Sequence, residues 1–175
     1  MPHATVHQVF SATAARTPRA EFLFTESVTA AAYGIAAGAI RWGEAAAEVE
    51  RLRVAYAEAG YGHGHRVGLL LENRPAFIFH WLALNALGVS VVPINSEMRS
   101  AELVYLIGHS EIGLAVTLPE RAADLRAAAA QAGIAFETMG PDDAVPSAKT
   151  AAPRAGEPVG IDTECGLLYT SGTTG

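Results

Sequence analysis

Six small residues at the carboxyl end of the chain are the strongest candidates for chemistry: Thr170, Ser171, Gly172, Thr173, Thr174 and Gly175. They follow Leu167-Leu168-Tyr169, which the pattern predicts to be a short buried strand. Because glycine reaches positive φ, such a run can turn several backbone N–H groups toward one ligand, and the hydroxyls add further donors. The pattern predicts a loop that holds phosphate oxygens. On composition alone, an ordinary polar turn remains the alternative.

Two common phosphate motifs do not fit this loop. Gly172 and Gly175 are too close together for the spacing of a phosphate-loop NTPase. The glycine pattern of dinucleotide-binding folds follows none of the strands that the sequence predicts. The spacing therefore supports neither of these two classes.

Histidine and cysteine side chains provide the other candidates. His63 and His65 lie in a glycine-rich stretch, but two ligands are too few for zinc, so we predict a surface turn rather than a metal site. His80 falls within an apolar helix and is predicted to be a hydrogen-bonded core residue. Cys165 has no histidine near it in sequence, which favours a packed thiol over a nucleophile.

The overall composition is that of a packed α/β protein. The 175 residues are 50% hydrophobic and 17% charged, with a net charge of -6, which disfavours nucleic acid and anionic membranes as partners. One cysteine cannot build a disulfide framework and suits a reducing compartment. The amino terminus lacks the pattern of a signal peptide. We therefore expect a cytoplasmic protein.

Strands and helices alternate along residues 42–139. A long amphipathic helix from Trp42 to Ala59 is followed by an apolar run without polar alternation, which is typical of a strand buried on both faces. The alternation predicts an α/β fold with a doubly wound, mostly parallel sheet flanked by helices. The expected elements after residue 59 are strands at 66–71, 89–94, 113–118 and 134–139, and helices from about 75, at 100–110 and up to Gly133.

Local signals refine the helix and strand boundaries. Thr5 with Gln8, and Thr117 with Glu120, fit capping boxes at the starts of two helices, and Asn73 is predicted to cap the helix that contains Pro75. Residues 22–25 are predicted to form a strand. Residues 28–40 are ambiguous, with a hairpin ending near Ile40 as the preferred interpretation.

Residues 75–94 carry no charged side chain apart from His80 and are just long enough to span a membrane as a helix. Gly88, Pro75 and Pro93 interrupt the segment, however. Since Gly88 separates a helical half from a β-branched half, a buried helix followed by a buried strand is the better interpretation, and we expect no membrane span.

Three regions follow from these patterns. Residues 1–139 form the α/β subdomain, and residues 140–161 form a proline-rich surface connector with little core-forming material. Residues 162–175 then supply a strand and the start of the phosphate loop. We see no site of its own in the connector.

The order of residues in Tyr169-Thr170-Ser171-Gly172-Thr173-Thr174-Gly175 resembles the phosphate-binding signature of the adenylate-forming (AMP-binding) superfamily. The resemblance covers most of the chain, and His65 stands where the family usually has aspartate. The segments around Asn73–Pro75 and Pro93–Asn95 look more like acyl-CoA ligases than peptide-synthetase adenylation domains. The similar upstream segments are Arg41–Glu44, Val49–Leu52, Gly64–Val67, Glu72–Phe77, Leu87–Val89, Val92–Asn95 and Glu102–Tyr105.

This resemblance implies an ATP-dependent acyl-CoA ligase. A carboxylic acid attacks the α-phosphorus of ATP to give an acyl-adenylate and pyrophosphate, and the thiol of coenzyme A then displaces AMP. By resemblance, Thr170–Gly175 hold the phosphates, and the Thr170 hydroxyl also contacts Mg²⁺. The family's catalytic residues fall beyond Gly175, so the chain looks like an amino-terminal part of the enzyme and is expected to be inactive alone.

Other classes of protein stay open on the residues. A non-catalytic binding module could retain the sheet and a relic of the loop, and a phosphate-loop NTPase or a peptide-synthetase adenylation domain could share its small residues. The residues that follow Gly175 discriminate between these hypotheses: Pro-Lys-Gly favours the ligase, and Lys followed by Ser or Thr favours the NTPase. The expected partners of the ligase are a small carboxylic acid, ATP and coenzyme A.

Overall fold

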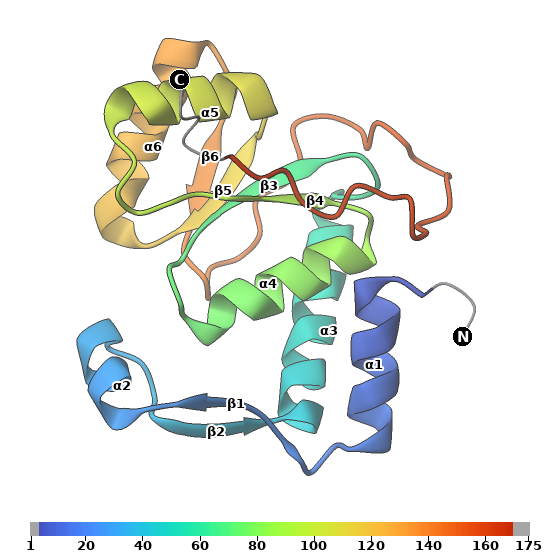
Figure 1. Ribbon diagram of the computed structural model, residues 1–175. Coiled ribbons are helices and arrows are strands. Elements are labelled where there is room, and N and C mark those ends of the chain that lie inside the picture. The colour runs from blue at the N-terminus through green and yellow to red at the C-terminus, as the bar shows by residue number, and fades with distance from the viewer. Residues whose placement is uncertain (1–3, 170–175) are drawn as a thin grey trace, which may run out of the picture.

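A four-stranded parallel sheet organises the computed structural model, which describes residues 4–169 (Figure 1). The strand order is β4-β3-β5-β6, so β3 lies in the interior and β4 at one edge. The register aligns Val67 with Val91 and Leu69 with Val116. The strands are β3 (Arg66–Leu70), β4 (Ser90–Pro93), β5 (Leu114–Thr117) and β6 (Glu137–Met139).

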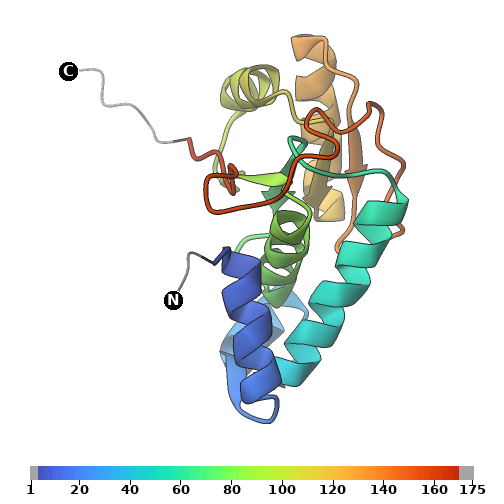
Figure 2. The same ribbon diagram turned by 90° about the vertical axis from the view of Figure 1, so that its right-hand side faces the viewer.

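Helices cover both faces of this sheet, which confirms the doubly wound α/β prediction. Side chains of β3 alternate between the two cores: Val67 and Leu69 belong to one buried cluster, and Leu70 belongs to the other. Figure 2 shows α1 running beside α3 on the first side. The first core contains α1 (Val6–Arg16), α3 (Trp42–Glu58) and α4 (Pro75–Ala86), and the second contains α5 (Ser100–Ser110) and α6 (Pro119–Ala132).

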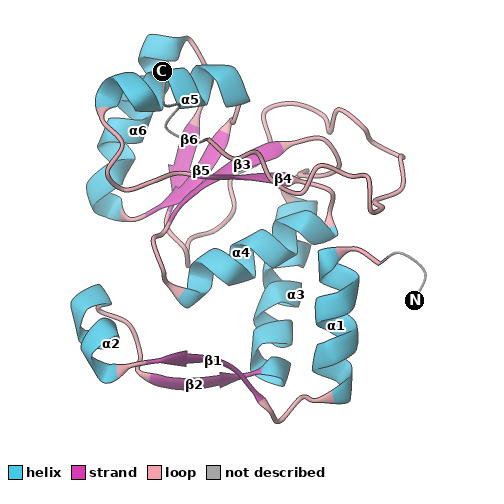
Figure 3. Cartoon of the chain, in the orientation of Figure 1, coloured by secondary structure: helices cyan, strands magenta, loops and turns pink. Residues whose placement is uncertain are grey.

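A small antiparallel pair, β1 (Glu21–Thr25) and β2 (Gly38–Arg41), lies away from the main sheet (Figure 3). The expected hairpin ending near Ile40 is therefore only partly right. Between the strands, α2 (Ser27–Tyr33) forms a helix because this stretch is rich in alanine, and Gly34 ends it with a left-handed φ of 63°.

One of the predicted helix caps is present. The backbone N–H of Gln8 donates to Thr5 Oγ1 at 3.2 Å, and the N–H of Thr5 donates to Gln8 Oε1 at 2.9 Å, which completes the capping box of α1.

The caps predicted at Asn73 and Thr117 are wrong. The N-caps of α4 and α6 are Arg74 and Leu118, and neither makes a side-chain capping bond. Proline is suited to the first helical position, so each helix begins at its proline and the residue just before it becomes the cap. Thr117 instead ends the buried strand β5.

Residues 75–94 form α4 and β4, as predicted, with Gly88 between them. Gly88 has a φ of +72°, and a Cβ there would lie 2.9 Å from the Val159 side chain and 3.0 Å from the His63 ring. Only glycine fits this turn. Within residues 4–169, no helix is both long enough and apolar enough to cross a membrane.

Residues 140–161 form turns and loops that lie against the amino ends of the strands and the carboxyl end of α3 (Figure 1). The N–H of Ala148 donates to Ala59 O at 2.8 Å, and the N–H of Arg154 donates to His63 O at 2.9 Å. Val145 also packs against the first core. The loop is thus tied to the domain at several points before the chain turns toward β4.

Candidate functional site

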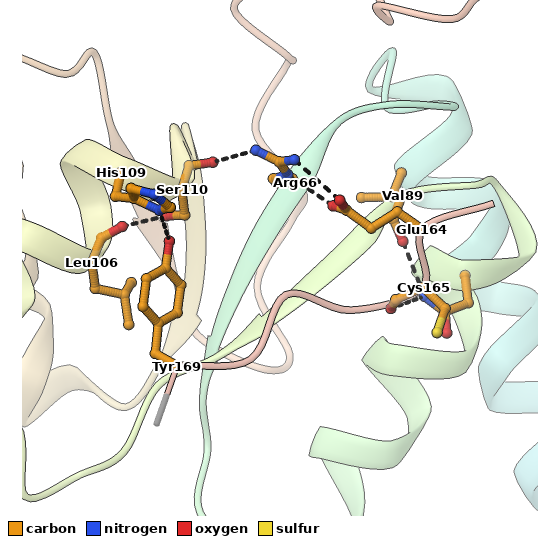
Figure 4. A network of polar contacts seen from close by, with 9 residues as sticks. Arg66, Val89, Leu106, His109, Ser110, Glu164, Cys165 and Tyr169 are labelled. Atoms are coloured by element: carbon orange, nitrogen blue, oxygen red, sulfur yellow. Dashed lines mark hydrogen bonds and ion pairs between the residues drawn. The ribbon is translucent and has the colours of Figure 1, made fainter. Parts of the chain in front are cut away.

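The six predicted phosphate-binding residues, Thr170–Gly175, lie outside the described residues, and the structure shows the segment that leads to them (Figure 4). The strand predicted at Leu167–Tyr169 is wrong. A single parallel bridge joins Gly166 to Val91, and Leu168 is 70% exposed. The reason is its position: the segment lies at the open edge of β4, and residues 4–169 place no further strand beside it.

Backbone and amide hydrogen bonds hold this segment against β4. The N–H of Leu167 donates to Val91 O at 2.9 Å, and the N–H of Val91 donates to Cys165 O at 3.3 Å. The buried Asn85 side chain donates to Cys165 O at 2.8 Å and to Val89 O at 3.0 Å. Because the bridge is parallel, the chain runs toward the carboxyl ends of the strands, which is where open α/β sheets bind their ligands.

An ion pair holds the beginning of the segment. Arg66, the first residue of β3, donates from Nε and Nη2 to the two carboxylate oxygens of Glu164 at 2.8 and 3.1 Å. Its Nη1 also donates to Ser110 O at 3.4 Å. The hydrogen bonds from Arg66 lower the pKa of Glu164 below its ordinary value. Since both side chains are partly exposed, we expect the pair to orient the chain more than it stabilises the fold.

A second contact holds the end of the segment. The Tyr169 hydroxyl lies 2.7 Å from Nδ1 of His109 on α5. Tyr105, one helical turn earlier, stacks on His109 with ring centroids 5.5 Å apart, and Tyr169 meets both rings edge-on. Partial burial raises the pKa of the Tyr169 phenol. The residue directly before Thr170 is therefore bound to a helix on the second face of the sheet.

The cysteine prediction is wrong and the histidine-turn prediction is partly wrong. Cys165 is exposed rather than packed, because its carbonyl oxygen takes the contacts with β4 and Asn85. His63 does lie in a turn, but it is only 9% exposed, since the connector covers it and Glu157 O lies 3.3 Å from its Nδ1. His65 contacts Thr150 at 3.3 Å. Residues 4–169 hold no group of three side chains suited to a metal ion.

His80 is the hydrogen-bonded core residue that the sequence predicts. It is 1% exposed, with Nδ1 2.8 Å from the Tyr56 hydroxyl and Nε2 3.0 Å from Pro141 O. Because a carbonyl oxygen can only accept, Nε2 carries the proton and Nδ1 accepts from Tyr56. Desolvation lowers the pKa of His80 to about 4, so the ring is neutral near pH 7.

Sequence reasoning missed a hollow of about 650 Å³ at the carboxyl ends of β3 and β4. Arg74 lies in its wall, paired with Glu72 at 2.7 Å and stacked 4.4 Å from the Tyr33 ring centroid. Glu72 adopts a φ of +54°, an uncommon backbone conformation for a residue other than glycine. The sequence does carry one signal for this hollow. Asn73 and Asn95 follow the predicted ends of β3 and β4, which places both residues at one edge of the sheet.

The parallel sheet, its two helical layers and the glycine-rich segment beyond the edge strand define an open α/β domain of the kind that binds ligands at its carboxyl edge. Comparison with known families identifies it further. The model of the AMP-binding enzyme family matches residues 10–175, so the chain belongs to the family of AMP-binding enzymes. The resemblance found in the motifs is confirmed, and the match includes Thr170–Gly175.

Curated relatives are coenzyme A ligases and synthetases. The chain is 34% identical over 143 residues to a sulfoacetate–CoA ligase of Cupriavidus necator, covering 78% of this chain and 28% of that protein. It is 32% identical over 140 residues to a feruloyl-CoA synthase of Amycolatopsis, covering 78% and 27%. A crotonobetaine/carnitine–CoA ligase of Salmonella paratyphi B is 36% identical over 70 residues, covering 40% and 14%. The chain thus spans little more than a quarter of the first two relatives.

Solved structures share the fold. O-succinylbenzoate coenzyme A synthetase from Bacillus subtilis, in complex with AMP, superposes with a TM-score of 0.71 at 22% identity, covering 95% of this chain and 39% of that one. Apo MatB from Rhodopseudomonas palustris gives a TM-score of 0.59 at 28% identity, covering 78% and 28%. The arrangement of the described residues therefore matches part of a larger enzyme.

Proposed function

We propose that this chain is the amino-terminal part of an ATP-dependent acyl-CoA ligase. The overall reaction would join a carboxylic acid to coenzyme A in two steps. The acid's carboxylate oxygen attacks the α-phosphorus of ATP and expels pyrophosphate; the sulfur of coenzyme A then attacks the acyl carbon and expels AMP. Adenylation is needed because a carboxylate is a poor electrophile, and AMP provides it with a good leaving group.

Thr170–Gly175 would hold the β- and γ-phosphates with backbone N–H groups and hydroxyls, so that the α-phosphorus faces the carboxylate in line. In this proposal, residues 1–139 are the α/β subdomain, residues 140–161 connect it, and residues 162–175 carry the loop. The Thr170 hydroxyl is the proposed contact for Mg²⁺. Among residues 4–169, no group of three histidine, cysteine or carboxylate side chains could add further ligands for this ion.

One observation carries the proposal: the family match continues through the phosphate-binding signature to Gly175, rather than stopping with the sheet. The relatives support coenzyme A as the acceptor by their names. They act on chemically different acids, so the acid is best found by experiment. We place the enzyme in the cytoplasm, in keeping with its acidic composition and single cysteine.

The test is acid-dependent exchange of labelled pyrophosphate into ATP, which reports the first half-reaction. The protein encoded by the complete reading frame should catalyse exchange with at least one member of a panel of fatty, aromatic, sulfonated and carnitine-type acids. Adding coenzyme A should then release AMP. If the complete protein contains the family's lysines and no acid on the panel supports exchange, the ligase proposal fails.

The 175-residue chain gives a second test. We propose that it neither turns over nor binds ATP tightly by itself, because the family's adenine-binding and catalytic residues lie after the signature. The same exchange assay, run on this chain with an acid that the complete protein accepts, should give no signal above buffer. Exchange by the 175-residue chain alone would contradict this part of the proposal and would place the catalytic groups within it.

A further inference from the structure

We propose that His109 is a positioning residue for the phosphate loop, which it fixes in place by binding the hydroxyl of Tyr169. The inference rests on the proposed function of Thr170–Gly175, and it adds to that function a residue some 60 positions upstream, on a different element. His109 itself touches neither ATP nor the acid in this account. Its role is to set where the loop begins.

The geometry singles out this contact. The Tyr169 hydroxyl and His109 Nδ1 are 2.7 Å apart, a short and therefore well-formed hydrogen bond. The Tyr105 ring stacks on the His109 ring, with an angle of 21° between the two. Because Tyr105 is itself 63% exposed, the three rings form a cluster on the surface rather than a part of the core.

The contact also comes at the right place along the chain. The backbone bonds to β4 end at Leu167, and the exposed Leu168 adds no burial. Tyr169 is then the last described side chain that packs against the second core before the run of small residues. Tyr169 therefore provides the contact that holds the described chain after Leu167.

A fixed starting point matters for a loop of this composition. Glycine, serine and threonine carry no large side chain that could pack against a core, so a binding segment of this composition relies on its neighbours for its position. Anchoring the neighbouring Tyr169 lowers the entropic cost of binding the phosphates, which is how preorganisation raises affinity. Loss of the anchor should therefore weaken phosphate binding without removing any group that touches the phosphates.

The first experiment measures anchoring in the 175-residue chain. Amide hydrogen exchange at Leu167, whose N–H donates to Val91 O, is compared among the wild type, His109→Leu, Tyr169→Phe and the double variant, with His7→Leu on α1 as the matched histidine control. We expect each anchor variant to speed exchange at this amide by about fivefold, the size expected for one surface hydrogen bond. The double variant should be no faster than either single variant, and His7→Leu should match the wild type.

His109→Asn provides the rescue. The Asn side chain can place a polar atom near the position of Nδ1, so its exchange rates should lie close to those of the wild type. Circular dichroism of each variant confirms that the fold is intact. Unchanged amide exchange in both His109→Leu and Tyr169→Phe overturns the inference. It is also overturned if the rate increases of the two single variants multiply in the double variant, because the two residues would then act independently.

The second experiment uses the complete protein. His109→Leu should raise the KM for ATP by about fivefold, the same loss of one anchoring bond, and leave the KM for the acid unchanged, and His109→Asn should restore the wild-type value. A KM for ATP that does not change overturns the inference. If the wild type itself releases no pyrophosphate, the proposed function fails. The amide hydrogen exchange experiment then still decides whether His109 anchors Tyr169.

Discussion

Two tyrosine–histidine pairs in this molecule have the same chemistry and opposite surroundings. Tyr56 and His80 meet at 2.8 Å between α3 and α4, both almost fully buried. Tyr169 and His109 meet at 2.7 Å on the outside of α5. The bond lengths are nearly equal, so distance alone does not reveal what each pair contributes.

Burial makes the difference. In the core pair, both histidine nitrogens are used, the tautomer is fixed, and water cannot replace a lost partner. In the surface pair, solvent reaches the rings and can satisfy whatever a substitution exposes. The Tyr56–His80 pair should therefore contribute to the stability of the fold, and the Tyr169–His109 pair only to the position of the segment that ends at Tyr169.

The largest expected effect is that of His80→Leu. The substitution leaves the Tyr56 hydroxyl and Pro141 O in the core without partners, which should lower the free energy of unfolding by about 3 kcal/mol. Urea unfolding followed by circular dichroism measures it. His109→Leu is the matched control and should cost less than about 0.5 kcal/mol. Similar losses in the two variants would show that burial does not separate the pairs.

Replacing each tyrosine by phenylalanine tests the same comparison with a smaller change in side-chain shape, because only the hydroxyl is removed. Tyr56→Phe leaves Nδ1 of His80 as a buried acceptor without a donor, and we expect a loss of about 1.5 kcal/mol. Tyr169→Phe should change the unfolding free energy by a few tenths of a kcal/mol at most, since water can take the place of the hydroxyl. The urea midpoints of the two variants give the measurement. Equal shifts would contradict the distinction.

The elements on which this comparison rests were predictable to different degrees. Apolar residues of α3 and α5 recur at helical spacing, and unbroken apolar runs mark β3 and β4, so periodicity alone places them close to their observed bounds. His80 was also predictable, because a histidine within an apolar helix must find partners when it is buried. Its actual partners, Tyr56 and Pro141, were not.

Three of the missed features share one cause. Each depends on segments far apart in the sequence: the connector that buries His63, the position at the edge of β4 that leaves Leu168 exposed, and the hollow between Tyr33 and Asn95. Local patterns carry no information about such neighbours. The surface pair is the clearest case, since nothing near His109 in the sequence points to a tyrosine 60 residues later.

Acid provides a third way to separate the pairs. The folded state holds the pKa of His80 at about 4, below its ordinary value of 6.5, so the unfolded chain binds a proton first as the pH falls. Stability is therefore complete above pH 6.5 and declines toward pH 4. Between pH 7.5 and 5.5 the loss due to His80 should be about 1 kcal/mol.

His80→Gln isolates this contribution. His7 and His65 also have lowered pKa values, because both are partly buried, and they add to the decline in every variant. The difference in slope between the wild type and His80→Gln, from urea unfolding at several pH values, belongs to His80. A parallel decline in the two proteins would mean that the ring is already protonated, or is not buried, in the folded state.

A small effect on stability is also expected at Arg66. Its ion pair with Glu164 is partly exposed, so Arg66→Met should lower the unfolding free energy by only about 0.5 kcal/mol. Added salt should reduce the wild type's advantage, because salt screens exposed charges. The local result should be clearer than the global one, since the pair holds the start of the segment that ends at Tyr169. Amide exchange at Leu167 should quicken in Arg66→Met while the core amides of β3 remain unchanged. If exchange in β3 quickens as much as at Leu167, then the chain end is part of the cooperative core, and the contrast between the two pairs would have to be abandoned.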